Sequence, residues 1–257
     1  MPTPSAARSE LEAFRVDGSP VGVLVSHGFT SSPQSMRPLA EAFAAAGHSV
    51  RLPLLPGHGT TWQELNTTSW RQWYGELERA LAELVSRCDV VVAVGLSMGG
   101  TLVTRLAEVH GDALSGLVLL NPVFRVDDPR IFALPLLHRI LPSLRGIGND
   151  VSRTDGEAEW CYDRVPLRAL ASQTQMWRRT VADLPRVTQP VLLFRSRVDH
   201  VVPASSSALF LRRVGSPDVT EVVLEHSFHV ATLDHDAPMI ASSAVAFAER
   251  VGRAGVS

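Results

Sequence analysis

The chain has 257 residues, a formal net charge of −2 and 45% hydrophobic residues. These values are typical of one large domain with a sizeable buried core. The near-neutral charge argues against a nucleic-acid or strongly anionic partner. Apolar runs are too short, and too often broken by Gly or Pro, to cross a bilayer as a helix. Residues 1–10 are polar and lack the apolar stretch of a signal peptide.

Cysteine usage gives an expectation about the compartment. The chain has two cysteines, Cys88 and Cys161, which can in principle pair. Two thiols in a core of this size favour a reduced protein without structural bridges, and therefore a cytoplasmic location.

Short apolar runs alternate with amphipathic segments along the chain. The runs that predict buried strands are residues 21–25, 49–52, 90–94, 116–120, 190–194 and 220–224. The segments that predict helices are 36–46 (capped by Ser35 and ended by Gly47), 70–87 (capped by Ser69), 101–110, 205–214 and 238–251. Buried strands that alternate with helices predict an α/β fold with a doubly wound, mostly parallel sheet.

The alternation stops after Pro122. Residues 123–180 show no strong strand pattern and consist of short helical pieces separated by Pro, Gly and Asp. Doubly wound folds bind ligands at the carboxyl edge of the sheet. We therefore expect residues 1–257 to form a single domain in which 123–180 is a cap inserted over that edge. Its apolar residues either line a substrate tunnel or form ordinary core; they include Leu134, Leu136, Leu137, Ile140, Leu141 and Trp160.

The strand at 90–94 runs directly into Gly95-Leu96-Ser97-Met98-Gly99, a Gly-x-Ser-x-Gly pentapeptide. Strand, tight turn and helix are the context in which this motif exposes a nucleophilic serine. Gly95 and Gly99 are expected where strand and helix nearly touch, with Ser97 held in a strained backbone conformation. The alternative is an ordinary serine in a glycine-rich loop, which the apolar strand and the following helix disfavour.

A serine hydroxyl is a weak nucleophile and needs a base that is held by a third group. In enzymes built around such a turn the chain order is nucleophile, acid, histidine. Asp199 follows the strand at 190–194 and is the predicted acid, whereas Asp183 precedes that strand.

Three histidines follow the last predicted strand: His226, His229 and His235. We choose His229 because it leaves room for a loop that turns back toward the serine, and we expect the other two at the surface or at a helix cap. His229 is then the base, and Asp199 fixes its tautomer and stabilises the imidazolium.

The tetrahedral intermediate of such a reaction needs two hydrogen-bond donors. The predicted donors are the backbone N–H groups of Met98 and of Phe29, which lies in the loop after the first long strand. His27 in that loop is then a structural residue. A rival interpretation makes His27 a metal ligand together with His58, but two histidines without nearby carboxylates are weak evidence for a metal.

Together these pieces resemble the α/β-hydrolase family, and more narrowly the small bacterial carboxylesterases and monoacylglycerol lipases. The resemblance rests on His27-Gly28-Phe29-Thr30 with Ser32-Pro33, Leu55-Pro56-Gly57-His58-Gly59, Gly95-Leu96-Ser97-Met98-Gly99-Gly100, Asp199-His200-Val201-Val202-Pro203 and Ser227-Phe228-His229-Val230-Ala231-Thr232-Leu233-Asp234. These pieces run from near the N-terminus to near the C-terminus.

The resemblance implies the α/β-hydrolase fold, a small mobile cap over an apolar acyl pocket, and no metal or organic cofactor. It also implies that Glu159, in the stretch 159–166, binds the glycerol hydroxyls of a monoacylglycerol. The alternative is that Glu159 is a solvated helix residue paired with Arg164 or Arg168.

We therefore expect a serine ester hydrolase that cleaves apolar acyl esters, with monoacylglycerol as the leading substrate. A general carboxylesterase on short- to medium-chain esters is the alternative, and carbon–carbon hydrolysis and peroxidation use the same triad. A catalytically idle ligand-binding protein is a further hypothesis, which reaction with a fluorophosphonate distinguishes. The expected partners are the small-molecule ester and, transiently through the cap, a lipid surface.

Overall fold

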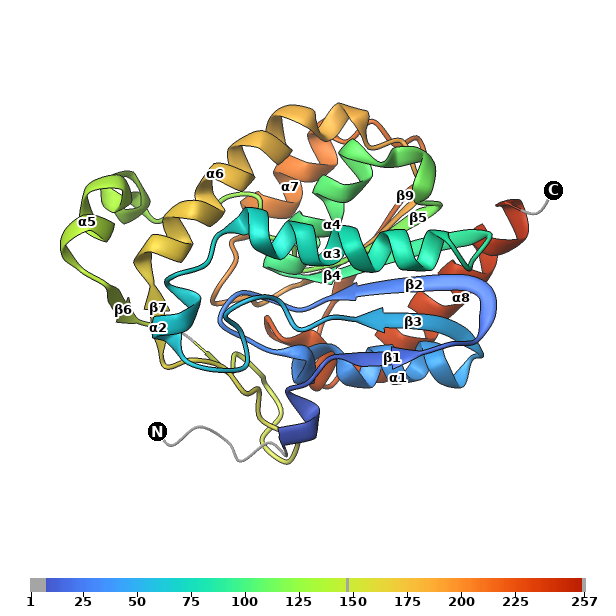
Figure 1. Cartoon of the computed structure of the whole chain (residues 1–257), viewed down its shortest axis with the longest axis horizontal. Helices are drawn as coiled ribbons and strands as arrows, with labels where there is room; N and C mark the ends of the chain where they lie inside the picture. The colour runs from blue at the N-terminus through green and yellow to red at the C-terminus, as the bar shows by residue number, and fades with distance from the viewer. Residues whose placement is uncertain (1–7, 147, 256–257) are drawn as a thin grey trace.

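The computed structural model describes residues 8–146 and 148–255 and is built on a seven-stranded sheet (Figure 1). The strand order is β1-β3-β2-β4-β5-β8-β9, and β1 is antiparallel to β3 while the other neighbours are parallel. The strands are β1 (Phe14–Val16), β2 (Ser19–Ser26), β3 (His48–Leu52), β4 (Val90–Leu96), β5 (Gly116–Leu120), β8 (Val191–Ser196) and β9 (Val219–Leu224). The predicted doubly wound, mostly parallel sheet is confirmed.

Helices cover both faces of the sheet (Figure 1). One face carries α3 (Trp70–Val85), α4 (Met98–Val109), α6 (Leu167–Asp183) and α7 (Ala204–Arg213), and the other carries α1 (Arg37–Ala45) and α8 (Ala237–Gly255). Along β4, Val91 and Ala93 belong to the first core, whereas Val92 and Val94 belong to the second. Successive strand side chains point to opposite faces, so β4 is buried on both.

The starts of three helices test two predicted caps and one predicted boundary. Gln72 accepts the Ser69 N–H at 2.9 Å, which confirms the cap of α3. The predicted cap at Ser35 is wrong, because this residue lies inside a 3₁₀ turn, η2 (Pro33–Met36), and donates to the Ser32 carbonyl. The helix α1 begins after that turn with a proline in its first residues, where the missing N–H is tolerated. The helix α4 begins at Met98, directly after the serine, and not at residue 101.

The segment between β5 and β8 differs from the prediction in two ways. Residues 167–183 form one long helix, α6, because no Pro or Gly interrupts them; it packs against α3 and α4. A small antiparallel sheet pairs β6 (Ser143–Arg145) with β7 (Arg164–Pro166). Before it, η4 (Pro129–Ala133) and α5 (Leu134–Ile140) form an arm that projects from the sheet, near the short α2 (Trp62–Leu65) at its base (Figure 1).

Three further expectations concern membrane-spanning helices, the cysteines and the N-terminal residues. No helix in the described ranges, 8–146 and 148–255, has the length and apolarity needed to cross a membrane. Cys88 and Cys161 are both free thiols. The expectation for residues 1–10 falls mainly on residues 1–7, which lie outside the described residues.

Candidate active site

Ser97 occupies the turn between β4 and α4, with φ 54° and ψ −115°. A Cβ at Gly95 would stand 2.4 Å from the Gly99 carbonyl carbon, and one at Gly99 would stand 2.4 Å from the Ser26 carbonyl oxygen. Strand and helix therefore approach so closely that any side chain at either glycine would clash, as the sequence predicted. A non-glycine residue in such a conformation costs about 1–3 kcal/mol, and such strain concentrates at functional sites.

Other strained residues surround the same edge of the sheet. Among the described residues, the non-glycine residues with positive φ are Thr30, Ser97, Asn121 and Asn149. Asn121 follows β5, and its Nδ2 donates to the His229 carbonyl at 2.9 Å. Thr30, Ser97 and Asn121 thus place the strain in the loops at the carboxyl ends of the central strands β2, β4 and β5, and Asn149 follows β6 of the small sheet.

Asp199 and His229 come together from the loops that follow β8 and β9. The distance from His229 Nδ1 to Asp199 Oδ2 is 2.7 Å, and both side chains are 8% exposed. The other carboxylate oxygen, Oδ1, accepts the Val201 and Val202 N–H groups at 2.8 and 2.7 Å. The Asp199 carboxylate is therefore oriented by its own loop, and it faces the imidazole.

Two opposing effects act on the pKa of His229. Burial works to lower it, but the nearby Asp199 carboxylate, with the charges of Glu159 and Asp150, outweighs burial and holds the pKa above its ordinary value. A carboxylate at Nδ1 stabilises the imidazolium that forms when Nε2 takes a proton. Within the described residues the Ser97 hydroxyl makes no hydrogen bond to the imidazole. Such contacts are often long before substrate binds.

The rejected candidates for acid and base lie elsewhere. Asp183 pairs with Arg105 at 2.5 Å and not with the histidine loop, which comprises residues 225–236 between β9 and α8. His226 and His235 are both exposed, as expected, and neither contacts Asp199. They line a surface hollow of about 470 Å³ on the outer side of the histidine loop.

His27 is fully buried in the loop after β2. Its Nδ1 donates to the Gly28 carbonyl at 3.0 Å, while its Nε2 accepts the Leu55 N–H at 3.2 Å. Burial lowers the pKa of His27 to about 4, so the ring is neutral. In a planar trans peptide the C=O and N–H point in opposite directions. The ring that holds the Gly28 carbonyl therefore also sets the direction of the Phe29 N–H.

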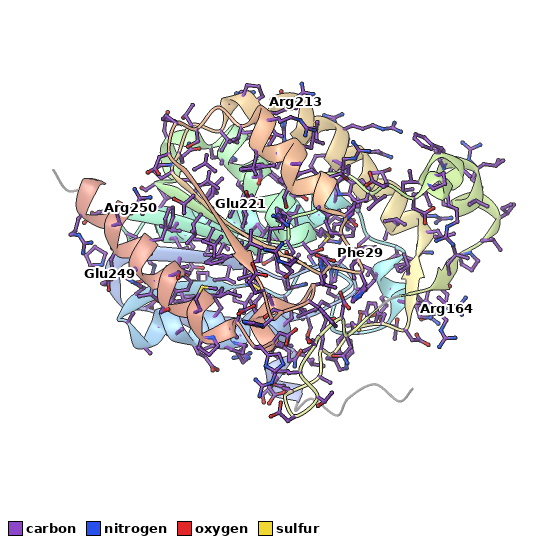
Figure 2. All side chains as sticks on the ribbon, turned by 180° about the vertical axis from the view of Figure 1, so that it is seen from behind. Phe29, Arg164, Arg213, Glu221, Glu249 and Arg250 are labelled. Carbon is purple, nitrogen blue, oxygen red and sulfur yellow. The ribbon has the colours of Figure 1, made fainter. Side chains whose placement is uncertain are left out.

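Phe29 and Met98 carry the predicted donor groups. Among the described residues, neither backbone N–H donates to a protein acceptor. A Cβ built on Gly28 would stand 3.6 Å from the Ser97 Cβ, so the serine lies beside this loop. Figure 2 shows Phe29 at the end of the sheet that faces the α5 arm. Two unoccupied N–H groups and the start of α4 favour negative charge at this point.

The metal alternative at His27 and His58 gains no support. The ring centroids are 4.9 Å apart at 69°, which is an edge contact. Burial, with His27 beside it, holds the pKa of His58 well below its ordinary value. The part of the chain that the structure describes holds no group of three or more His, Cys, Asp or Glu suited to a metal ion.

Glu159 lies on a stretch outside any helix or strand and is only 7% exposed. Its Oε2 accepts the Asn149 N–H at 3.1 Å, and its own N–H donates to Asn149 Oδ1 at 2.7 Å. Burial raises the pKa of Glu159, although hydrogen bonding from Ser31 and the charge of His229 act in the opposite direction. A buried carboxylate therefore stands close to the imidazole.

The alternative role of Glu159, a solvated helix residue paired with an arginine, is wrong. Arg164 Nε donates to Ser143 Oγ at 2.7 Å, and Arg168 is tied by its backbone to Asn66. Among the described residues neither arginine forms an ion pair with the Glu159 carboxylate, which instead accepts the Asn149 N–H.

The stretch that carries Glu159 runs along the segment that follows β2. Tyr162 N–H donates to the Thr30 carbonyl at 3.0 Å, and Trp160 N–H donates to Gln34 Oε1 at 3.1 Å. Backbone contacts therefore hold this stretch beside the residues that follow Phe29.

Sequence reasoning did not identify two further carboxylates at the site. Asp150 Oδ2 accepts the His229 N–H at 3.2 Å, and Asp234 Oδ2 accepts the Phe228 N–H at 2.9 Å. Both contacts with the histidine loop are made to backbone amides, which no side-chain pattern reveals. Asp234 stands within the quoted run 227–234, but only as part of the resemblance.

A mostly parallel sheet, a strained serine turn and an Asp–His pair at one sheet edge define the α/β-hydrolase class. The chain belongs to the family described as serine aminopeptidase, S33, whose model matches residues 20–236.

Known proteins support this assignment. The chain is 41% identical to a thermostable monoacylglycerol lipase from Bacillus sp. (strain H-257), over 93% of this chain and 94% of the relative. It is 38% identical, with a TM-score of 0.90, to a solved structure from work on the metagenome-derived lipolytic enzymes LipS and LipT, covering 94% of this chain and 98% of the other. The monoacylglycerol lipase of Paleococcus ferrophilus has the same fold at 21% identity, with a TM-score of 0.76 and coverage of 93% and 99%.

Proposed function

We propose that this protein is a serine ester hydrolase that releases a fatty acid from monoacylglycerol. Ser97 is the nucleophile, His229 the general base, and Asp199 the group that orients it. The observation that carries the proposal is the 2.7 Å contact between His229 Nδ1 and Asp199 Oδ2, at the sheet edge where the strained serine turn lies. The similarity to a monoacylglycerol lipase along 93% of the chain supports the choice of substrate.

The mechanism follows from these positions. Ser97 Oγ attacks the ester carbonyl as His229 Nε2 takes its proton, and the Phe29 and Met98 N–H groups stabilise the oxyanion. His229 then gives the proton to the departing glycerol oxygen, which leaves an acyl-serine. A water molecule, deprotonated by the same imidazole, releases the fatty acid. These steps use only groups of this chain, the substrate and water.

Turnover of a monoacylglycerol, of the methyl ester of the same acid and of an aminoacyl anilide tests the proposal. We expect kcat/KM for monoacylglycerol to exceed that for the methyl ester by about tenfold or more, because the glycerol hydroxyls add hydrogen bonds to a charged group. Equal rates on both esters would favour a general carboxylesterase, and preference for the anilide would favour an aminopeptidase. Absence of ester hydrolysis and of fluorophosphonate labelling would favour an idle binding protein.

Glu159 is proposed to bind the glycerol hydroxyls. A carboxylate this deeply buried is costly to desolvate unless donors satisfy it, and a monoacylglycerol offers two hydroxyl donors. We expect Glu159→Gln to lower kcat/KM for monoacylglycerol by about ten- to a hundredfold, and to leave the methyl ester of the same acid nearly unchanged.

The control is Asp163→Asn, which removes an exposed carboxylate from the same stretch. It should leave both rates as they are. If Glu159→Gln lowers both rates equally, or lowers neither, Glu159 does not recognise glycerol.

Segment 123–180 is proposed to act as a cap that opens at a lipid surface. Ser97 is only 8% exposed, which leaves little open surface around the nucleophile for a bulky acyl ester. The α5 arm presents apolar side chains to solvent, since Phe132, Leu136 and Ile140 are 84%, 66% and 71% exposed. Leu136 and Ile140 therefore do not line a tunnel in this structure. Exposed Arg139 and Arg145 stand near them in sequence and favour an anionic lipid surface.

The triple change Phe132→Ser, Leu136→Ser and Ile140→Ser tests this contact. We expect binding to phosphatidylglycerol-containing vesicles to fall by about tenfold or more, since each buried methylene contributes about 0.8 kcal/mol. Hydrolysis of a soluble acetyl ester should stay unchanged. Val85→Ser is the control, because Val85 is also exposed, at 45%, but lies on α3. Unchanged vesicle binding by the triple variant would contradict the contact.

We also propose a cytoplasmic location, supported by the two free cysteines of the described chain. Cell fractionation checks it.

A further inference from the structure

The catalytic pair depends on two loops that follow different strands. Asp199 lies between β8 and α7, and His229 lies between β9 and α8. A small displacement of one loop relative to the other would misalign the 2.7 Å contact between them. A misplacement of about 1 Å at such a site can lower the rate by about a hundredfold.

One carboxylate from a third segment contacts both loops. Asp150 lies after β6, and its side chain is 9% exposed. Its Oδ2 accepts two backbone N–H groups, from His229 at 3.2 Å and from His200 at 3.1 Å. His200 directly follows the acid of the pair. The backbone carbonyl of Asp150 also accepts the Val230 N–H at 3.1 Å.

Asp234 of the histidine loop makes the opposite contact, to the segment that carries Asp150, and is fully buried. Its Oδ2 accepts the Ser152 and Phe228 N–H groups at 2.7 and 2.9 Å. Its Oδ1 accepts the Arg153 and His235 N–H groups at 3.0 and 2.8 Å. The carboxylates of Asp150 and Asp234 therefore link residues 150–153 to the histidine loop. These contacts fix the position of Asp150.

From this arrangement we propose that Asp150 is a positioning residue of the active site: it holds the backbones of His200 and His229 so that the imidazole stays aligned on Asp199. The proposal rests on the proposed function, since alignment matters only if His229 is the base. Asp150 acts through the histidine and touches neither the substrate nor the serine.

Asp150 also places negative charge near the imidazole. The charged groups that face His229 are Asp199, Glu159 and Asp150, and the group that faces Asp150 from the other side is His200, with Nδ1 at 2.8 Å from Oδ1. A carboxylate favours the charged imidazolium and so raises the pKa of His229. Removing the charge must therefore lower that pKa and move the acid limb of the kcat/KM profile to lower pH.

Two variants separate alignment from charge. In Asp150→Asn the remaining oxygen can still accept both backbone N–H groups, but the charge is gone. We expect kcat on the high-pH plateau to stay within about threefold of wild type, and the acid limb to move down by about 0.5 unit or more. In Asp150→Ala both functions are lost, and we expect kcat on the plateau to fall by about ten- to a hundredfold with a smaller change in KM.

The control is Asp155→Asn, which removes a carboxylate that is 82% exposed on the same segment and should change neither quantity. If Asp150→Ala keeps the wild-type kcat and neither variant moves the acid limb, the proposal is overturned. If Asp150→Ala does not fold, Asp150→Ser, whose shorter side chain cannot reach both backbone N–H groups, is measured for the same loss of kcat. Titration of the His229 imidazole by NMR in wild type and Asp150→Asn gives the same comparison without substrate. A wild-type protein that hydrolyses no ester would thus contradict the proposed function, while the titration still decides the influence of Asp150 on His229.

Discussion

Ser97→Ala should lower kcat for ester hydrolysis by about 10⁴- to 10⁶-fold, as removal of a triad nucleophile does in other serine hydrolases. The fold should survive. In the described part of the chain the Ser97 hydroxyl makes no hydrogen bond, and the strained turn is held by its neighbours: the Ser97 N–H donates to Leu120, and its carbonyl accepts the Val123 N–H. The thermal midpoint of Ser97→Ala should therefore stay close to that of wild type.

Mass spectrometry after treatment with a fluorophosphonate checks this prediction. The label should sit on the peptide that contains Ser97 and should be absent from Ser97→Ala. Ser242→Ala, at an exposed serine of α8, is the control and should be labelled and active like wild type. A label on another serine, together with activity in Ser97→Ala, would reject the assignment of the nucleophile.

The sheet could be predicted because its strands are long enough to show a pattern. The apolar run of β4 and the similar runs of β2 and β5 are buried on both faces, so each reads as a continuous hydrophobic stretch. Strands β1, β6 and β7 have three residues each, which is too short for any period to appear. Their pairing is decided by tertiary contacts.

The residues of the candidate site also fall into those that the sequence could place and those that it could not. Ser97, Asp199 and His229 could be placed because each follows a predicted strand, and parallel strands end at one edge of a sheet. Glu159 could not be placed from the residues alone and came only with the resemblance. Asp150 binds backbone N–H groups 50 and 79 positions away, at His200 and His229. No local pattern encodes such a contact, so it became visible only in the folded chain.

His229→Ala should lower kcat almost as much as Ser97→Ala, because without a base the serine stays protonated. Asp199→Asn should lower kcat by about 10⁴-fold. An asparagine NH₂ facing Nδ1 favours the tautomer that carries its proton on Nε2, and that nitrogen can then no longer accept the Ser97 proton. His226→Ala and His235→Ala are the controls, since both side chains are exposed, and each should lose less than about tenfold.

The pH profile of p-nitrophenyl ester hydrolysis gives the second measure of this pair. The pKa of His229 is raised by Asp199. Because the free enzyme needs a neutral imidazole, kcat/KM should fall as the pH drops below that raised value. In Asp199→Asn the residual activity should have its acid limb at lower pH, since the charge that favoured the imidazolium is gone. An acid limb that stays in place in Asp199→Asn would mean that a group other than His229 titrates. If His226→Ala or His235→Ala were inactive, that histidine would be the base instead of His229.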